Sequence, residues 1–376
     1  RGGARARAMR CSAAAGAAPT AAPRALPLLL LLALPPLRGG ASDYVPPRPT
    51  HDLGPMGPLR GEYGFLTQFS HISEKEAKSR VRLMQSNFGI MEYQFYNAFG
   101  NYSTPPDSDK LNHWYTSAFH EKVERDIVKA YIEEIKFWGG RAWLTVQAMG
   151  TDPGDTESQK DFKVHGQYLV EDKPLVDVIA PTPEWGKHWA PRWIKFAVDM
   201  GFSGIHWNTL GNFEGELGSA ADVLGFLRAT LPLVTEAGLG QTFNFVDGFQ
   251  WDPTAVSDSL VAFTFWPAWS RPAKEDAFAK NVPAGSVFLC FPGTDEDHSG
   301  EWWQEEDVKG RHPFDLIVDR WSHARCHGNT YLAVGDGNRH ITTDYYPDAK
   351  EMSEEEVKTL IEKVFDNPPC TFDESA

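Results

Sequence analysis

The sequence lacks the short motifs that mark several common enzyme classes. It contains no Walker phosphate loop, no His-Glu-x-x-His zinc motif and no Ser-His-Asp signature, so those chemistries receive little support. Cysteine is scarce, with four residues and none of the paired spacings that bind metals. We therefore predict no metal and no cofactor. The three cysteines beyond Cys11 are Cys290, Cys326 and Cys370. They could form one disulfide and leave one free thiol, or all three could be buried thiols.

Positive charge is also in short supply. The chain has 36 Lys and Arg against 51 Asp and Glu, which gives a net charge of −15. Residues 1–41 contain six Arg and no acid, so the net charge becomes −21 without them. Such a surface repels nucleic acid and anionic membranes and suits a neutral ligand. We expect neither nucleic acid nor a membrane as a partner once the N-terminal segment is removed.

The apolar run Leu26–Leu37 is too short to span a bilayer comfortably. Arginines precede it and small residues follow it, which is typical of a secretory signal. We expect residues 1–41 to be a cleaved signal and the chain to be secreted, with an organelle transit peptide as the alternative. Residues 42–59 are rich in Pro and Gly and predict a linker. In a secreted chain, Asn101-Tyr102-Ser103 is a usable glycosylation sequon.

Residues 60–370 alternate strand-like apolar runs with amphipathic helix-like segments. This alternation predicts an α/β fold, a single (β/α)₈ TIM barrel. The predicted strands are Tyr63–Phe69, Ile90–Tyr96, Ala142–Ala148, Gly204–Trp207, Thr242–Val246, Val261–Phe265, Val287–Phe291 and Tyr331–Val334. Predicted helices include Glu121–Phe137, Lys187–Met200, Ala220–Ala237 and Asp315–Cys326. A doubly wound open sheet fits the alternation nearly as well, but no glycine-rich loop follows the first strand.

The residues at the predicted strand ends are rich in amides and aromatic rings. Amides donate and accept hydrogen bonds at once, which matches sugar hydroxyls, and rings cover the apolar face of a sugar. His206 has two open interpretations, a buried hydrogen-bonded histidine or a ligand contact. Asp336 lies in a Gly-Asp-Gly sequence that is also typical of an ordinary turn. The candidate sugar-binding residues are Tyr96, Asn97, His206, Asn244, Asp247, Trp266, Trp269 and Asp336.

Four segments resemble, in the same order, blocks of glycoside hydrolase family 66, the dextranases and cycloisomaltooligosaccharide glucanotransferases. They are Tyr93–Asn97 (YQFYN), Gly201–Gly211 (GFSGIHWNTLG), Phe243–Gly248 (FNFVDG) and Gly335–His340 (GDGNRH) with the later YYP and MS. The resemblance covers about residues 60–366. It implies a barrel that binds an α-glucan-like oligosaccharide. Family members use two carboxylates, a nucleophile and an acid/base, about 5 Å apart.

This chain departs from the family pattern at the positions that carry the chemistry. Asn208 stands where the family has its nucleophilic Asp, and Asn97 also replaces a family acid. The acid/base Glu maps near Pro267, but residues 260–270 contain no acid. The resemblance with these departures predicts a catalytically degenerate carbohydrate-binding protein. The alternative is an active glycoside hydrolase or transglycosylase with substitute acids, of which the candidates are Glu214 and Glu216, with Asp247 a further possibility.

Overall fold

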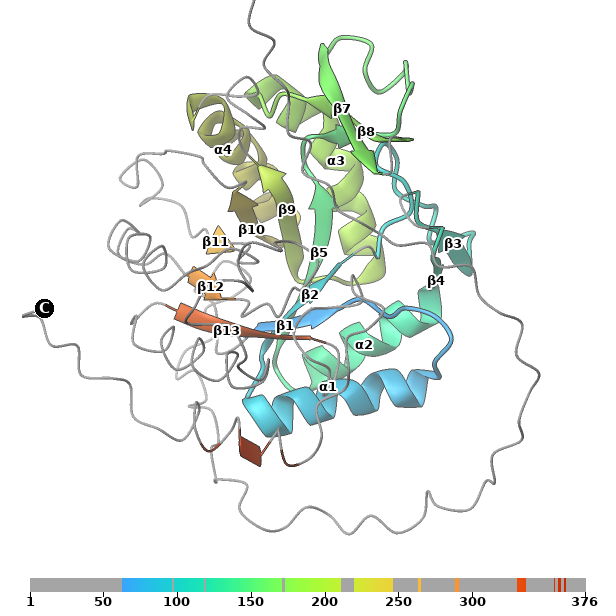
Figure 1. Cartoon of the computed structure of the whole chain (residues 1–376), viewed down its shortest axis with the longest axis vertical. Helices are drawn as coiled ribbons and strands as arrows, with labels where there is room; N and C mark the ends of the chain where they lie inside the picture. The colour runs from blue at the N-terminus through green and yellow to red at the C-terminus, as the bar shows by residue number, and fades with distance from the viewer. Residues whose placement is uncertain are drawn as a thin grey trace, which may run out of the picture.

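The computed structural model describes residues 63–96, 98–117, 120–170, 173–210, 220–245, 263–264, 288–290, 330–335 and four residues between 355 and 362. Within them, one α/β sheet of eight parallel strands pairs in the order β1-β13-β12-β11-β10-β9-β5-β2, and β2 pairs in turn with β1 (Figure 1). Each strand therefore has a hydrogen-bonded neighbour on both sides. The strands are β1 (Tyr63–Leu66), β2 (Glu92–Phe95), β5 (Arg141–Gln147), β9 (Gly204–Leu210), β10 (Gly240–Phe245), β11 (Phe263–Thr264), β12 (Phe288–Cys290) and β13 (Thr330–Gly335).

Among the described residues, four helices cover one face of the sheet, and α1 packs on α2 as α3 packs on α4 (Figure 1). Local sequence fixes several of their ends. Ser73 accepts a hydrogen bond from the Glu76 amide at the start of α1, and Thr182 caps α3 in the same way. Gly201 ends α3 with a φ of 89°, a conformation that favours glycine. The helices are α1 (Glu74–Phe88), α2 (Arg125–Phe137), α3 (Pro183–Met200) and α4 (Ala220–Glu236).

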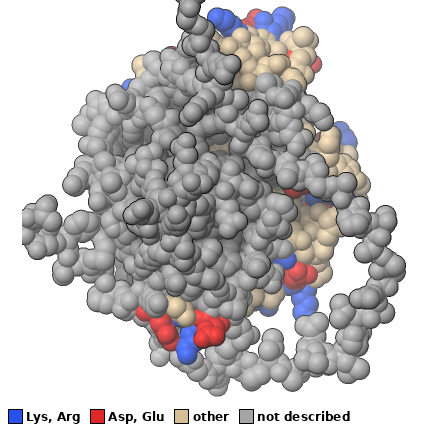
Figure 2. Space-filling view, in the orientation of Figure 1, with Lys and Arg blue, Asp and Glu red and all other residues tan. Residues whose placement is uncertain are grey.

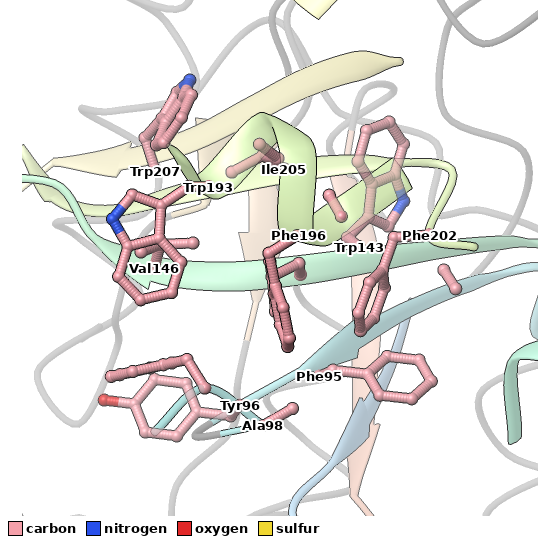
Figure 3. Close-up of a cluster of buried hydrophobic side chains, with 14 of the residues drawn as sticks. Phe95, Tyr96, Ala98, Trp143, Val146, Trp193, Phe196, Phe202, Ile205 and Trp207 are labelled. Atoms are coloured by element: carbon pink, nitrogen blue, oxygen red, sulfur yellow. The ribbon is translucent and has the colours of Figure 1, made fainter. Parts of the chain in front are cut away.

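Aromatic side chains fill the layer between the sheet and these helices (Figure 3). The Trp207 ring on β9 lies 6.0 Å from that of Trp189 on α3 and 5.6 Å from that of Phe226 on α4. The Phe95 ring on β2 likewise lies 5.0 Å from that of Phe202, just beyond α3. Because side chains alternate along a strand, the neighbours of Trp207 point to the opposite face. We call that opposite face the inner face of the sheet.

A buried ion pair joins β2 and β5 on the inner face, near the amino ends of the strands. Arg141 Nη2 lies 2.7 Å from Glu92 Oε1, and the two side chains are 5% and 0% exposed. Trp143 Nε1 donates to Glu92 Oε2 at 2.6 Å. The Trp143 ring also covers Gly204 of β9, where an added Cβ would lie 2.3 Å from a ring carbon. Only glycine fits at that position, so the pair and the ring fix β2, β5 and β9 together.

Two small antiparallel sheets complete the described fold. The first pairs β3 (His113–Tyr115) with β4 (Lys122–Glu124) in the connection between β2 and α2. The second has the order β6-β8-β7 and lies in the connection between β5 and α3. Its strands are β6 (Gly150–Thr151), β7 (Val164–Val170) and β8 (Lys173–Ile179).

Where described residues are visible in Figure 2, acidic and basic side chains lie near one another in small groups. Pairs such as Lys78 with Glu133 link neighbouring helices α1 and α2, with Nζ and Oε2 2.9 Å apart. Such exposed pairs contribute little stability. Across the described residues, no helix is both long enough and apolar enough to cross a membrane.

The α/β class and a parallel sheet with strands at all eight predicted places are confirmed. Several boundaries differ. The helix predicted from Glu121 begins at Arg125, because Lys122–Glu124 pairs with β3 instead. Helix α3 begins four residues earlier than predicted and tolerates Pro191 in its interior. Strand β9 continues through Asn208 to Leu210 rather than ending at Trp207.

Candidate functional site at the carboxyl edge of the sheet

The carboxyl ends of β2, β5, β9 and β10 bring several predicted site residues to adjacent positions. Tyr96 directly follows β2 and is buried beside Phe65, with the two ring centroids 5.1 Å apart. Gln147 at the end of β5 pairs in register with Asn208 of β9. Asn244 lies on the backbone of β10, next to β9. Among the described residues at these strand ends, none is a carboxylic acid.

Asn208 is buried on the inner face, with 2% of its surface exposed. Its neighbour Trp207 packs against the helices, so the Asn208 amide points the other way. Its backbone carbonyl accepts a hydrogen bond from the Ala148 amide at 3.2 Å. Its side-chain Oδ1, however, has no hydrogen-bond partner within the described part of the chain. A buried polar atom without a partner is costly, so this oxygen is suited to receive a donor from a bound molecule.

Two more buried oxygens of adjacent strands share this feature. Gln94 Oε1 on β2 and Thr145 Oγ1 on β5 are buried and lack partners among the described residues. Gln94 alternates with the helix-facing Phe95, and Thr145 pairs in register with His206, so both belong to the inner face. Neither residue was among those predicted from the sequence. A polar residue within an otherwise apolar strand was the available signal.

His206 lies two residues before Asn208 on the same face of β9 and is fully buried. Its Nδ1 lies 2.8 Å from Thr242 Oγ1 of β10. Burial lowers the pKa of His206 to about 3, because the charged imidazolium is poorly solvated there. The ring is therefore neutral near pH 7. Of the two interpretations from the sequence, a buried and hydrogen-bonded histidine describes its surroundings in this structure.

The buried state of His206 predicts a pH-dependent stability. The ordinary pKa of 6.5 applies in the unfolded chain, and the folded value is about 3. Below pH 6.5 the unfolded state binds the extra proton, so the contribution is complete above that pH and is lost as the pH falls towards 3. We expect a loss of up to about 1.4 kcal/mol per pH unit from this group. Urea unfolding at several pH values between 7 and 4 gives the free energy of unfolding at each pH. This free energy should fall less steeply with decreasing pH for His206→Gln than for the native chain. An equal pH dependence of the two would contradict a neutral buried ring.

Carboxylates hold the loops beyond the strand ends in place. Asp152 accepts hydrogen bonds from the Tyr102 and Ser103 amides at 3.1 and 3.0 Å and from Ser117 Oγ at 2.9 Å. It thereby ties the loop after β2 to the loop after β5. These bonds engage both carboxylate oxygens of Asp152.

Asp177 on β8 plays a similar part within the second small sheet. Burial alone would raise its pKa, but hydrogen bonds from the Gly154 amide and from the Gln167 and Gln159 side chains outweigh that effect and lower the pKa. The carboxylate therefore stays ionised and fully engaged with its own loop. Like Asp152, it has a structural role that leaves it poorly suited to attack or protonate a substrate.

A surface groove of about 670 Å³ lies elsewhere, between the first turns of α1 and α2 and the β3–β4 hairpin. Its lining mixes acidic and basic side chains, such as Glu74, Lys75 and Lys122. None of the predicted site residues lines it. Over the described residues, no group of three or more His, Cys, Asp or Glu side chains is arranged to hold a metal ion.

Much of the predicted site lies outside the described residues. For Asn244 the structure describes the backbone, which belongs to β10, but not the side chain. The same holds for the N-terminal segments 1–41 and 42–59, the predicted helix Asp315–Cys326 and the cysteines Cys326 and Cys370. The predicted site residues outside the described ranges are Asn97, Glu214, Glu216, Asp247, Trp266, Pro267, Trp269 and Asp336.

The parallel sheet with helices on its outer face, and polar side chains at its carboxyl edge, define an α/β protein of the architecture found in many glycoside hydrolases. The model of glycosyl hydrolase family 66 matches residues 61–273, more than half of the chain. The chain therefore belongs to glycosyl hydrolase family 66. A search of curated proteins found no match.

Among the solved structures, 529 chains match. A cycloisomaltooligosaccharide glucanotransferase from Paenibacillus sp., complexed with cycloisomaltoheptaose, is 17% identical with a TM-score of 0.51, over 61% of this chain and 38% of that one. This chain thus spans well under half the length of that protein. A cyclic α-maltosyl-(1→6)-maltose hydrolase from Arthrobacter globiformis is 12% identical with a TM-score of 0.46, over 78% of this chain and 72% of that one.

Proposed function

We propose that the chain forms a (β/α)₈ barrel whose mouth binds an α-glucan-like oligosaccharide without cleaving it. One observation carries the proposal: Asn208, which the sequence resemblance aligns with the family nucleophile, is a buried amide whose Oδ1 lacks a partner among the described residues. Membership of family 66 supports a carbohydrate ligand. The ring of eight parallel strands, each with two neighbours, supports the barrel.

The chemistry of Asn208 explains why binding and cleavage separate. A retaining hydrolase needs a carboxylate to attack the anomeric carbon and to balance the charge of the oxocarbenium-like transition state. An amide is neutral and far less nucleophilic. It can, however, accept a hydrogen bond from a sugar hydroxyl through Oδ1. Gln94 Oε1 and Thr145 Oγ1 add further unpartnered oxygens on the same face.

The second candidate function is that of an active hydrolase or transglycosylase, and family membership is the observation that favours it. In that case Glu214 or Glu216, beyond the end of β9, would replace the missing acids. Asp152 and Asp177 are poor substitutes, because hydrogen bonds from neighbouring loop and strand residues already occupy their carboxylates. A glucan ligand is shared by both candidates, and the Paenibacillus neighbour, solved with cycloisomaltoheptaose, supports that choice of ligand. We further propose that the chain acts in the secretory pathway or outside the cell.

Calorimetric titration with isomaltooligosaccharides tests the role of Asn208. Asn208→Ala removes one hydrogen-bond acceptor and should weaken binding roughly 2- to 10-fold, the effect of about 0.5–1.5 kcal/mol. Asn208→Asp keeps the shape and the acceptor oxygens and should bind within a few-fold of the native chain. Ser86→Ala, on the exposed surface of α1, is the control and should bind like the native chain. Equal affinity for Asn208→Ala and the native chain would rule out contact between Asn208 and the sugar.

A further inference from the structure

We propose that Asn101 is a site of N-linked glycosylation and that its glycan lies beside the carboxyl edge of the sheet. The proposal rests on the proposed secretory location and is independent of the proposed sugar-binding function. Asn101-Tyr102-Ser103 is the one Asn-x-Ser/Thr sequence in the chain. It lies in the loop that follows β2, on the same edge as Tyr96 and Asn208.

Of the three sequon residues, only the acceptor is exposed to solvent. Asn101 is exposed, whereas Tyr102 and Ser103 are buried, with 4% and 3% of their surfaces accessible. Asn101 Oδ1 accepts a hydrogen bond from the Thr104 amide at 2.9 Å. This bond uses the amide oxygen, whereas a glycan attaches through Nδ2. The fold is therefore compatible with a sugar chain on Asn101 that projects into solvent.

The two residues after Asn101 are engaged by Asp152. The Tyr102 and Ser103 amides donate to its carboxylate, and Ser103 Oγ accepts from the Asp152 amide at 2.9 Å. Arg192 Nη1 also donates to the Ser103 carbonyl at 2.9 Å. The sequon hydroxyl is therefore inaccessible once the loop has docked. Glycan transfer must precede this docking and so takes place while the chain is being synthesised and translocated.

The reaction needs a lipid-pyrophosphate-linked oligosaccharide as the second substrate. Asn101 Nδ2 loses one proton and forms a bond to the anomeric carbon of the oligosaccharide. The bond between that carbon and the pyrophosphate oxygen breaks, and the lipid pyrophosphate leaves with the bonding electrons and takes up the proton released from Nδ2. No oxidant or reductant takes part.

The test is expression of the full chain behind a secretion leader in cultured animal cells. Treatment with peptide N-glycosidase should increase the electrophoretic mobility of the secreted protein and convert Asn101 to Asp, as read by peptide mass spectrometry. Secreted native protein with an unmodified Asn101 would overturn the proposal.

Three variants separate the glycan from folding defects. Asn101→Asp keeps the oxygen that accepts from Thr104 but removes the acceptor nitrogen, so the mobility shift should disappear. The variant should unfold at the same temperature as the native chain whose glycan has been removed. Ser103→Ala should also abolish the shift, and Ser103→Thr should retain it, because a hydroxyl is kept. A shift that persists in Asn101→Asp would place the glycan elsewhere and overturn the proposal.

Discussion

Replacing Arg141 with Met is expected to lower the free energy of unfolding by about 3–5 kcal/mol. The substitution leaves Glu92, which is 0% exposed, as a buried carboxylate without its guanidinium partner. Arg141 also donates through Nε to both oxygens of Glu92, at 2.9 and 3.1 Å. A domain of this kind has a total stability of about 5–15 kcal/mol, so the loss is a large share of it. Urea unfolding of the native and variant chains gives the difference directly.

The matched control is the double variant Glu92→Leu with Arg141→Met. Removing both charges leaves no unpaired ion, and such replacements are often close to neutral. We expect the double variant to be more stable than Arg141→Met alone, although Trp143 Nε1 loses its acceptor. A cost below about 1 kcal/mol for Arg141→Met would mean that water reaches the pair, as at an exposed ion pair.

Replacing Trp207 with Ala is expected to cost about 3–5 kcal/mol through the cavity left between β9 and the helices. The ring is 0% exposed and packs on Trp189 and Phe226. Its Nε1 also donates to Gln241 Oε1 at 3.0 Å, and that bond is lost as well. Since Asn208 is the next residue, the shift of β9 should also weaken sugar binding in the proposed site.

Trp207→Phe separates packing from the hydrogen bond. It keeps most of the aromatic volume and removes the indole N–H, so its cost should be clearly smaller than that of the Ala variant. Guanidinium unfolding with tryptophan fluorescence and far-UV circular dichroism as two probes measures both variants. Equal costs for Phe and Ala would show that the hydrogen bond to Gln241, rather than ring packing, holds β9 against the helices.

The sequence predicted the strands better than their surroundings. Short apolar runs that alternate with amphipathic helix-like segments located all eight strands. The hairpin β7–β8 escaped prediction. Its strands, VHGQYLV and KPLVDVI, contain both polar and apolar residues and give no clear apolar run. Their pairing also depends on Asp177, which holds the loop before β7 through the Gly154 amide.

The site was predictable only in part. The sequence selected His206 and Asn208 as candidates, and the ring contacts of the intervening Trp207 with the helices put both on the inner face. The unpartnered oxygens of Gln94 and Thr145 were not predictable, because they depend on which strands lie side by side. The pairing of β5 with both β2 and β9 joins segments far apart in the chain. No local pattern reports such contacts.

The most direct test of a sugar-binding barrel without hydrolase activity is one preparation assayed in two ways. Calorimetry measures binding of isomaltooligosaccharides, and release of reducing sugar measures cleavage of the same ligands and of dextran. The variant Asn208→Asp with Pro267→Glu serves as the comparison with acids restored. We predict that the native chain binds and releases no sugar above the buffer blank. Release by the native chain that disappears in Glu214→Gln or Glu216→Gln would contradict the account.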